Sequence, residues 1–227
     1  PPPLDAFRKQ LLCSDGALEL EEIPRSMLIV GGGAVGCEFA CLYHELGCAV
    51  TMIEKMTNLL PGEDEQVVNA LRKSFEGRGI RVKDSVTVQK VEKRDGSWAA
   101  TLSDGTELET EQILVCVGRK PAAGTLNFEN ARVEWGARGI TLDEHLRTSN
   151  PDVFAAGDVT GLSLLAHAAS AQGEVAAANA LGENKFYDGS LIPRCLYTWP
   201  EVASVGLWKS QAAEKGYSVK TQRFFFQ

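Results

Sequence analysis

The stretch Met27–Glu54, MLIVGGGAVGCEFACLYHELGCAVTMIE, decides the fold of this 227-residue chain. It begins with a short apolar run typical of a buried parallel strand, which ends at a glycine-rich turn. Gly31 allows a tight turn, Gly33 leaves room for a pyrophosphate to approach bare backbone, and Gly36 lets the next helix pack closely on the strand. The helix start, which includes Ala34 and Val35, offers free N–H groups and a positive dipole end. The pattern predicts a dinucleotide-binding unit.

The helix and the strand that follow support this interpretation. A helical repeat of apolar residues predicts the buried face of a helix that stops near Gly47: Phe39, Leu42, Tyr43 and Leu46. The run 49–53 then reads as a second buried strand that ends at Glu54. A carboxylate at this point accepts hydrogen bonds from a ribose diol and repels a 2′-phosphate. No arginine lies between Cys48 and Gln66, although Lys55 offers one positive charge, so NAD is favoured over NADP.

Further along, the element types alternate. An apolar stripe predicts a helix that ends by Gly79, and 80–82 reads as a third parallel strand. Strands at 86–91 and 98–102, joined by Asp95-Gly96, predict an antiparallel meander, and 112–117 is expected to return to the parallel sheet. Beyond them we expect a strand over 152–156 and an alanine-rich helix over 164–181. The predicted fold class is α/β: a Rossmann-like parallel sheet with helices on one face, an antiparallel β-meander, and part of a second subdomain.

Composition narrows the function classes. A net charge of −7 without a long basic run argues against nucleic acid or an anionic membrane as partner. No apolar stretch approaches the ~20 residues of a membrane span, and the start PPPLDAFRKQLL lacks the pattern of a signal peptide, so we expect a cytoplasmic protein. The six cysteines show no CxxC spacing and few histidines lie nearby, which predicts no metal site. We expect most of these thiols to be buried packing residues.

Five blocks in order carry a family resemblance: IPRSMLIVGGGAVGCEFA, VCVGRKPA, VFAAGDVTG, LLAHAASAQG and YTWPEVASVG. Together they resemble the flavoprotein disulfide reductases, the class I pyridine nucleotide-disulfide oxidoreductases, and most of all the branch that oxidises dihydrolipoamide with NAD⁺. The resemblance covers nearly the whole chain.

The resemblance implies roles for particular residues. Glu38 matches a glutamate near the nicotinamide and flavin, an auxiliary catalytic position, although it could equally be a first-turn acid that complements the helix dipole. Gly118 matches a backbone position close to the NAD nicotinamide. Asp158 matches an aspartate that binds the ribityl chain of FAD, or it is a turn-forming residue. A helix start that faces the FAD pyrimidine ring is matched by Leu165, Ala166 and His167.

The resemblance also implies that parts of the parent enzyme lie outside this chain. The family's first glycine fingerprint for FAD, its redox-active cysteine pair and its C-terminal catalytic histidine have no counterpart here. We therefore expect an inactive, monomeric fragment of a homodimeric enzyme that acts on a lipoyl-bearing protein, with doubtful retention of FAD. The expected division is a linker over 1–22, an NAD-binding domain over 23–121, an FAD-contacting segment over 122–191 and the start of an interface domain over 192–227.

Two alternatives stay open. One is a related flavoprotein, such as a soluble transhydrogenase, a mercuric-type reductase or an NADPH-linked disulfide reductase. The other is a stand-alone nucleotide-binding module without chemistry of its own.

Overall fold

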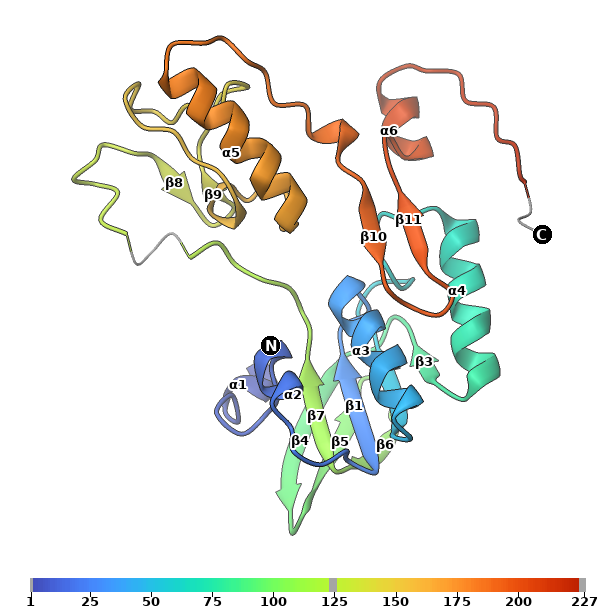
Figure 1. Cartoon of the computed structure of the whole chain (residues 1–227). Helices are drawn as coiled ribbons and strands as arrows, with labels where there is room; N and C mark the ends of the chain where they lie inside the picture. The colour runs from blue at the N-terminus through green and yellow to red at the C-terminus, as the bar shows by residue number, and fades with distance from the viewer. Residues whose placement is uncertain (1, 123–125, 225–227) are drawn as a thin grey trace. The chain divides into compact units, whose positions relative to one another are not determined.

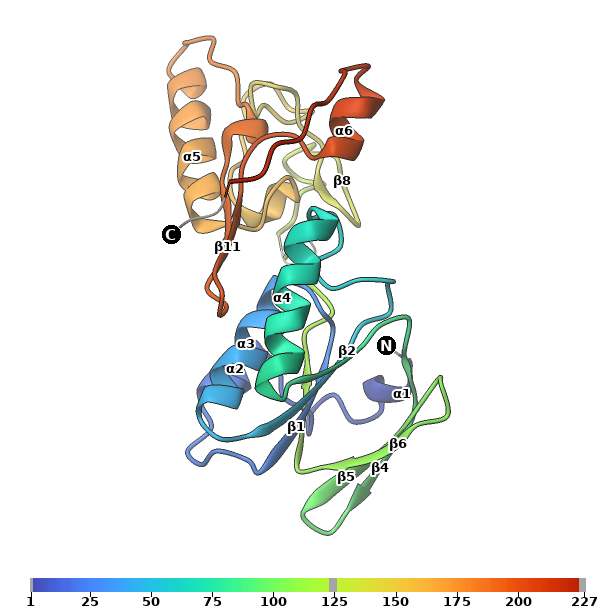
Figure 2. The same ribbon diagram turned by 90° about the vertical axis from the view of Figure 1, so that its right-hand side faces the viewer.

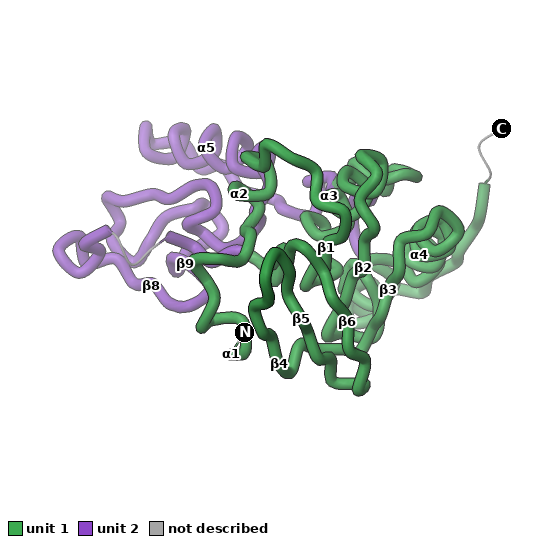
Figure 3. Tube along the Cα trace, turned by 90° about the horizontal axis from the view of Figure 1, so that it is seen from below, with its two compact units in different colours: residues 1–118, 195–203, 208–227 green, residues 119–194, 204–207 purple. Residues whose placement is uncertain are grey.

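A computed structural model describes residues 2–122 and 126–224 (Figure 1). The chain forms two compact units, coloured separately in Figure 3. Unit 1 contains residues 1–118, 195–203 and 208–227, and unit 2 contains residues 119–194 and 204–207. A late segment of the chain thus belongs to the same unit as the glycine-rich turn. Each unit is described by itself below.

Unit 1 is built on a four-stranded parallel sheet in the order β3-β2-β1-β7. Its strands are β1 (Ser26–Val30), β2 (Ala49–Ile53), β3 (Arg81–Lys83) and β7 (Gln112–Val115). The central strand β1 pairs with β2 on one side, Met27 opposite Val50, and with β7 on the other, Leu28 opposite Ile113. The glycine-rich turn therefore follows the carboxyl end of the central strand β1, and open α/β sheets bind ligands at this edge.

The two faces of this sheet bury different partners because side chains alternate along a strand. Met27 and Ile29 join the core under the helices α3 (Ala34–Glu45) and α4 (Glu65–Arg78). Leu28 and Val30 join a second core under the meander. Figure 2 shows the helices on one side of β1 and β2 and the meander on the other. The predicted fold class, with helices on one face and a meander, is confirmed.

The meander is a three-stranded antiparallel sheet of β4 (Val88–Arg94), β5 (Ser97–Leu102) and β6 (Glu107–Thr110). On β5 the buried residues Trp98, Ala100 and Leu102 alternate with half-buried ones. At the start of the chain lie two short helices, α1 (Pro2–Asp5) and α2 (Ser14–Leu18). Leu4 packs into the meander core, whereas Ala17 packs into the helix-side core.

Residues 195–203 of a hairpin late in the chain also pack in unit 1. The hairpin consists of β10 (Arg194–Leu196) and β11 (Val202–Ser204), followed by helix α6 (Lys209–Glu214). Leu196 and Val202 are buried in the helix-side core. The backbone N–H of Trp199 donates to the Cys41 sulfur at 3.3 Å, and its carbonyl accepts from the Ser74 hydroxyl at 3.0 Å. The hairpin is therefore anchored to both helices of the nucleotide-binding fold.

Unit 2 is organised around one long helix. It holds the two-residue strands β8 (Trp135–Gly136) and β9 (Gly139–Ile140), the 3₁₀ turns η2 (Asp158–Thr160) and η3 (Gly189–Leu191), and helix α5 (Ala166–Ala180). The buried face of α5 carries small side chains and Gln172, which is 0% exposed. Among residues 2–122 and 126–224, none of the helices combines the length and apolar character of a membrane span.

Two expectations from the sequence are wrong in detail. The run 152–156 forms no strand; Phe154 makes an isolated bridge with Arg147. The pairing ends after the bond from Ala155 N–H to the Leu146 carbonyl at 3.1 Å, because the partner segment forms a tight turn over 143–146, closed by Leu146 N–H on the Asp143 carbonyl. On α3, Leu42 and Leu46 are 43% and 51% exposed. Phe39 and Tyr43 are buried as predicted, and the smaller Cys37, Ala40 and Cys41 complete the buried face in place of the two leucines.

Candidate functional site: the turn between β1 and α3

Two glycines of the turn are required by the packing of the protein itself. A Cβ at Gly31 would lie 2.4 Å from the Cys116 carbonyl oxygen, and φ at Gly31 is 113°. A Cβ at Gly36 would lie 2.0 Å from the Gly31 carbonyl oxygen. Contacts below 3 Å are far inside van der Waals distance, so the close approach of helix and strand depends on both residues.

Gly33 is different. Its φ of −75° and ψ of −176° are accessible to any residue. Apart from the glycine and its two chain neighbours, no described residue has an atom within 4 Å of a Cβ built at this position. The fold could therefore hold a larger residue here, and its side chain would stand in the open space at the start of α3. A bare backbone at this point fits the close approach of a ligand such as a pyrophosphate.

The start of α3 provides donors for an anion. Gly33 is the N-cap, and no described side chain caps it. The first bond of the helix runs from Cys37 N–H to the Gly33 carbonyl at 3.0 Å, which places the N–H groups of Ala34, Val35 and Gly36 before the regular ladder. Ala34 and Val35 are exposed. The helix dipole adds positive potential at the same point.

Glu54 lies at the end of β2 beside this turn and is 8% exposed. Its Oε2 accepts from Gly32 N–H at 2.6 Å, and its Oε1 accepts from Met56 N–H at 2.7 Å. A carboxylate has about four lone-pair sites, so each oxygen keeps capacity for a ribose hydroxyl. The two backbone donors fix the orientation of the group.

Gly32 was missed as a site residue by the sequence analysis. A Cβ at Gly32 would lie 2.6 Å from Leu59 Cδ2 and 3.0 Å from Glu54 Cβ. The middle glycine of the run 31–33 is therefore explained by Leu59 and by the acidic residue, Glu54, that pack against it, and the unbroken GGG was the signal for it.

Gly118 and Glu38 lie at two further points of unit 1. Gly118 follows β7, is exposed, has φ of 107° and has open space around its Cα. Glu38 is the fifth residue of α3, and the first turn of that helix holds no acidic residue, so its interpretation as a first-turn acid is wrong. Its Oε1 accepts instead from Tyr197 N–H at 2.9 Å, at the end of β10.

The predicted FAD-contacting residues lie in unit 2. Asp158 is exposed at the start of η2, after Gly157, whose φ is 84°. Gly157 N–H donates to Gln172 Oε1 at 2.7 Å, which ties this turn to α5. Leu165 is the N-cap of α5 and forms no side-chain cap, so this helix start also offers free N–H groups. Ala166 and His167 are exposed, and His167 Nε2 lies 2.7 Å from the Pro193 carbonyl oxygen, where it must donate.

The thiols differ in exposure. Cys37, Cys41 and Cys48 are buried, Cys116 is half-buried, and Cys13 and Cys195 are exposed, so the expectation that most thiols are buried holds for three of the six. Burial raises the pKa of Cys48 to about 11 and that of the half-buried Cys116 to about 12. Among the described residues, no group of three acidic, histidine or cysteine side chains is placed to hold a metal ion.

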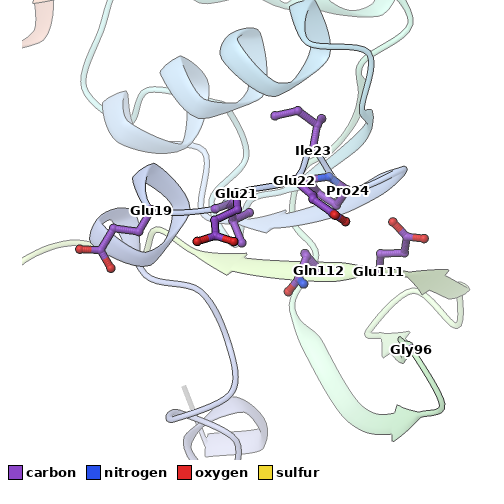
Figure 4. A pocket seen from close by; sticks show the side chains of 9 residues that line it. Glu19, Glu21, Glu22, Ile23, Pro24, Gly96, Glu111 and Gln112 are labelled. Atoms are coloured by element: carbon purple, nitrogen blue, oxygen red, sulfur yellow. The ribbon is translucent and has the colours of Figure 1, made fainter.

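A pocket of about 530 Å³ lies elsewhere in unit 1, and its lining is drawn in Figure 4. It is found at the amino ends of β1 and β7, the opposite end of the sheet from the glycine turn. Four of its lining residues are glutamates: Glu19, Glu21, Glu22 and Glu111. Because this surface repels phosphates, the turn after β1 is the better nucleotide site.

Comparisons with known proteins agree with this geometry. The family model "Pyridine nucleotide-disulphide oxidoreductase" matches residues 3–173, and the dimerisation-domain model of the same family matches residues 192–227. A dihydrolipoyl dehydrogenase from Thermus scotoductus is 41% identical over an alignment that covers 100% of this chain and 51% of that protein. A mercuric reductase from Staphylococcus aureus is 38% identical over 92% of this chain and 39% of its own length.

A solved structure gives the same result. LpdA from Mycobacterium tuberculosis superposes with a TM-score of 0.79 at 32% identity, over 87% of this chain and 43% of that one. The chain spans about half the length of the curated relatives it matches.

Proposed function

Because the chain belongs to the pyridine nucleotide-disulphide oxidoreductase family, we propose that it is the NAD-binding part, with a portion of the FAD site, of a dihydrolipoyl dehydrogenase. The family consists of FAD-dependent enzymes that use NAD or NADP. The observation that carries the proposal is the open space at Gly33, because the fold does not require glycine there and a dinucleotide does.

The residues of the glycine turn have different proposed roles in dinucleotide binding. Gly31 and Gly36 bring α3 against β1, and Gly33 gives the pyrophosphate access to the N–H groups of Ala34 and Val35. Glu54 accepts from the ribose hydroxyls and disfavours a 2′-phosphate, which supports NAD over NADP. Gly118 leaves room at the nicotinamide end. When NAD⁺ is bound, its nicotinamide ring is the hydride acceptor.

Glu38 and the residues of unit 2 serve the flavin side of the proposal. Glu38 is proposed as an auxiliary residue near the nicotinamide and flavin, and its bond to Tyr197 N–H holds the carboxylate in place. Asp158 is proposed to bind the ribityl chain of FAD. The uncapped start of α5, at Leu165, Ala166 and His167, is proposed to stabilise negative charge on reduced flavin.

The parent enzyme is proposed to be a homodimer that oxidises a lipoyl-bearing protein through FAD and a redox disulfide. The dimerisation-domain match supports the interface segment over 192–227 and the homodimer. The boundaries 1–22, 23–121 and 122–191, the monomeric state of this chain and a cytoplasmic location remain predictions. A mercuric-type reductase is the second candidate, favoured by the relative from Staphylococcus aureus.

Calorimetric titration of the 227-residue chain with NADH and with NADPH tests the proposal. We expect tighter binding of NADH, and we expect Gly33→Val to weaken it at least about tenfold, or about 1.4 kcal/mol. Gly77→Val is the matched control, because Gly77 lies on α4 in the same unit and also has open space around it. Tighter binding of NADPH would contradict the role of Glu54, and equal binding by both valine variants would contradict the role of Gly33.

A further inference from the structure

The residues that follow β2 fold back onto the glycine turn. We call residues 54–63 the clasp loop. Gly32 donates its N–H to Glu54 Oε2 at 2.6 Å, and its carbonyl accepts from Leu60 N–H at 2.8 Å. Leu59 is 0% exposed and lies against the Cα of Gly32. The clasp loop therefore hydrogen-bonds both the N–H and the carbonyl of Gly32 and so fixes the backbone of the glycine turn.

The clasp loop contains a strained residue. Leu60 has φ of 48° and is 4% exposed. It is followed by Pro61 and Gly62, and Glu63 N–H closes the turn on the Leu60 carbonyl at 3.0 Å. Proline second and glycine third, with φ of 100° at Gly62, are typical of a type II turn. A leucine in the left-handed region is strained and persists only when its surroundings hold it there.

Trp208 provides such a surrounding. A Cβ built on Gly62 would lie 2.9 Å from Trp208 Cη2 and 3.1 Å from Cζ3, so the indole lies directly over the glycine. The indole N–H also donates to Glu63 Oε2 at 3.3 Å. The indole thus contacts both residues that close the turn after Leu60.

Trp208 is an unfavourable choice for its own helix. It is the N-cap of α6, a position where Ser, Thr, Asp and Asn are preferred because their oxygens accept from the first N–H groups. An indole has a donor only and cannot do this. The helix start is stabilised instead by Gln211, whose side-chain oxygen accepts from the backbone N–H of Trp208 at 3.1 Å. The contact with the clasp loop therefore explains a tryptophan at this position better than helix capping does.

We propose that Trp208 is a positioning residue for dinucleotide binding: it fixes the clasp loop and, through Leu60 and Gly32, the glycine turn and Glu54. The inference rests on the proposed function, because it concerns the affinity of the same site. Trp208 reaches the nucleotide only through the clasp loop, so its loss changes affinity without removing a ligand contact.

The test is Trp208→Thr in the 227-residue chain, because threonine caps α6 better while it removes the indole from Gly62. We expect the Kd for NADH, measured by calorimetry, to rise roughly threefold to tenfold, in the range seen when packed networks that couple to a site are altered. Trp208→Phe keeps a ring over Gly62 and is expected to restore the Kd to within about twofold. Trp135→Thr, in β8 of unit 2, is the matched control and should leave the Kd unchanged.

Urea unfolding of each variant separates positioning from folding. A reversibly unfolded fraction raises the apparent Kd by the reciprocal of the folded fraction, and irreversibly unfolded chains lower the number of sites. Positioning therefore requires a higher Kd with an unchanged number of sites in a variant whose folded fraction without urea stays near one. If wild type binds NADH and Trp208→Thr binds it with the same Kd, the inference is overturned and the proposed function stands. A fall in the number of sites alone also overturns it. If wild type binds no NADH, both the proposed function and the inference fail.

Discussion

The two helix starts that the sequence singled out, at α3 and at α5, differ in how completely the described chain builds them. The turn before α3 is enclosed: Gly31, Gly32 and Gly36 admit no side chain, and Glu54 and Leu60 bond to its backbone. At the start of α5, Ala166 and His167 are exposed, and so is Asp158 in the preceding turn η2, which is joined to α5 by the bond from Gly157 N–H to Gln172. A local β-α-β unit can complete a dinucleotide turn from its own residues. The second start shows donors and an acid whose roles rest on the family resemblance.

The largest expected effect concerns the alkylation rates of the thiols next to the glycine turn before α3. Cys37 is 0% exposed, and burial raises the pKa of Cys116 to about 12, so near pH 8 the Cys116 thiol stays almost wholly in its unreactive protonated form. Iodoacetamide should therefore modify the exposed Cys13 and Cys195 at least about a thousandfold faster than Cys37 and Cys116. Peptide mass spectrometry after timed alkylation measures these rates.

Comparable rates at all four cysteines would show that the turn opens readily, and the contrast between the two helix starts would be lost. Alkylation in urea is the control, since all four thiols should then react alike.

The second prediction asks whether the glycines of the first turn have separate roles. Gly36→Ala should destabilise unit 1 by about 3 kcal/mol or more, because its Cβ would lie 2.0 Å from the rigid Gly31 carbonyl. Gly33→Ala should change stability by less than about 0.5 kcal/mol. Urea unfolding followed by circular dichroism gives both values. Equal stability of the two variants would mean that packing does not distinguish these glycines.

The third prediction concerns unit 2, where one side chain ties distant segments together. Asn179 is 4% exposed; its Nδ2 donates to the carbonyls of His145 and Lys185 at 2.8 Å each, and its Oδ1 accepts from Lys185 N–H at 2.7 Å. Asn179→Ala leaves these backbone groups unpaired, which should cost about 1–3 kcal/mol. Hydrogen exchange along α5 and residues 183–187 should become faster to match.

Asn184→Ala is the matched control, because Asn184 is exposed nearby. If both variants exchange like the wild type, unit 2 does not depend on this buried amide.

Periodicity and turn chemistry were enough to predict most of unit 1 from the sequence. The strands β1 and β2, the turn and the meander follow from local patterns, and the parallel return of β7 follows from its continuous apolar run. The packing of the late hairpin on α3 and α4 could not be predicted, since it depends on backbone bonds to Cys41 and Ser74 that leave no periodic signal. The clasp over Gly32 escaped notice for a similar reason: the left-handed Leu60 has no signature in the sequence.

The smallest expected effect lies at the edge of unit 1 and depends on pH. The Lys83 ammonium, at 2.7 Å, and the Thr106 N–H hold the pKa of Asp104 well below its ordinary range. Because the folded pKa is depressed, this interaction stabilises the fold above the unfolded pKa of about 3.9 and is lost as the pH falls through the lower folded pKa. The urea midpoint of Asp104→Asn should therefore lie slightly below that of wild type near neutral pH, and the gap should narrow below about pH 4. Asp95→Asn, in the exposed turn of the same meander, should show no such gap, and a gap that widens on acidification would contradict the assignment.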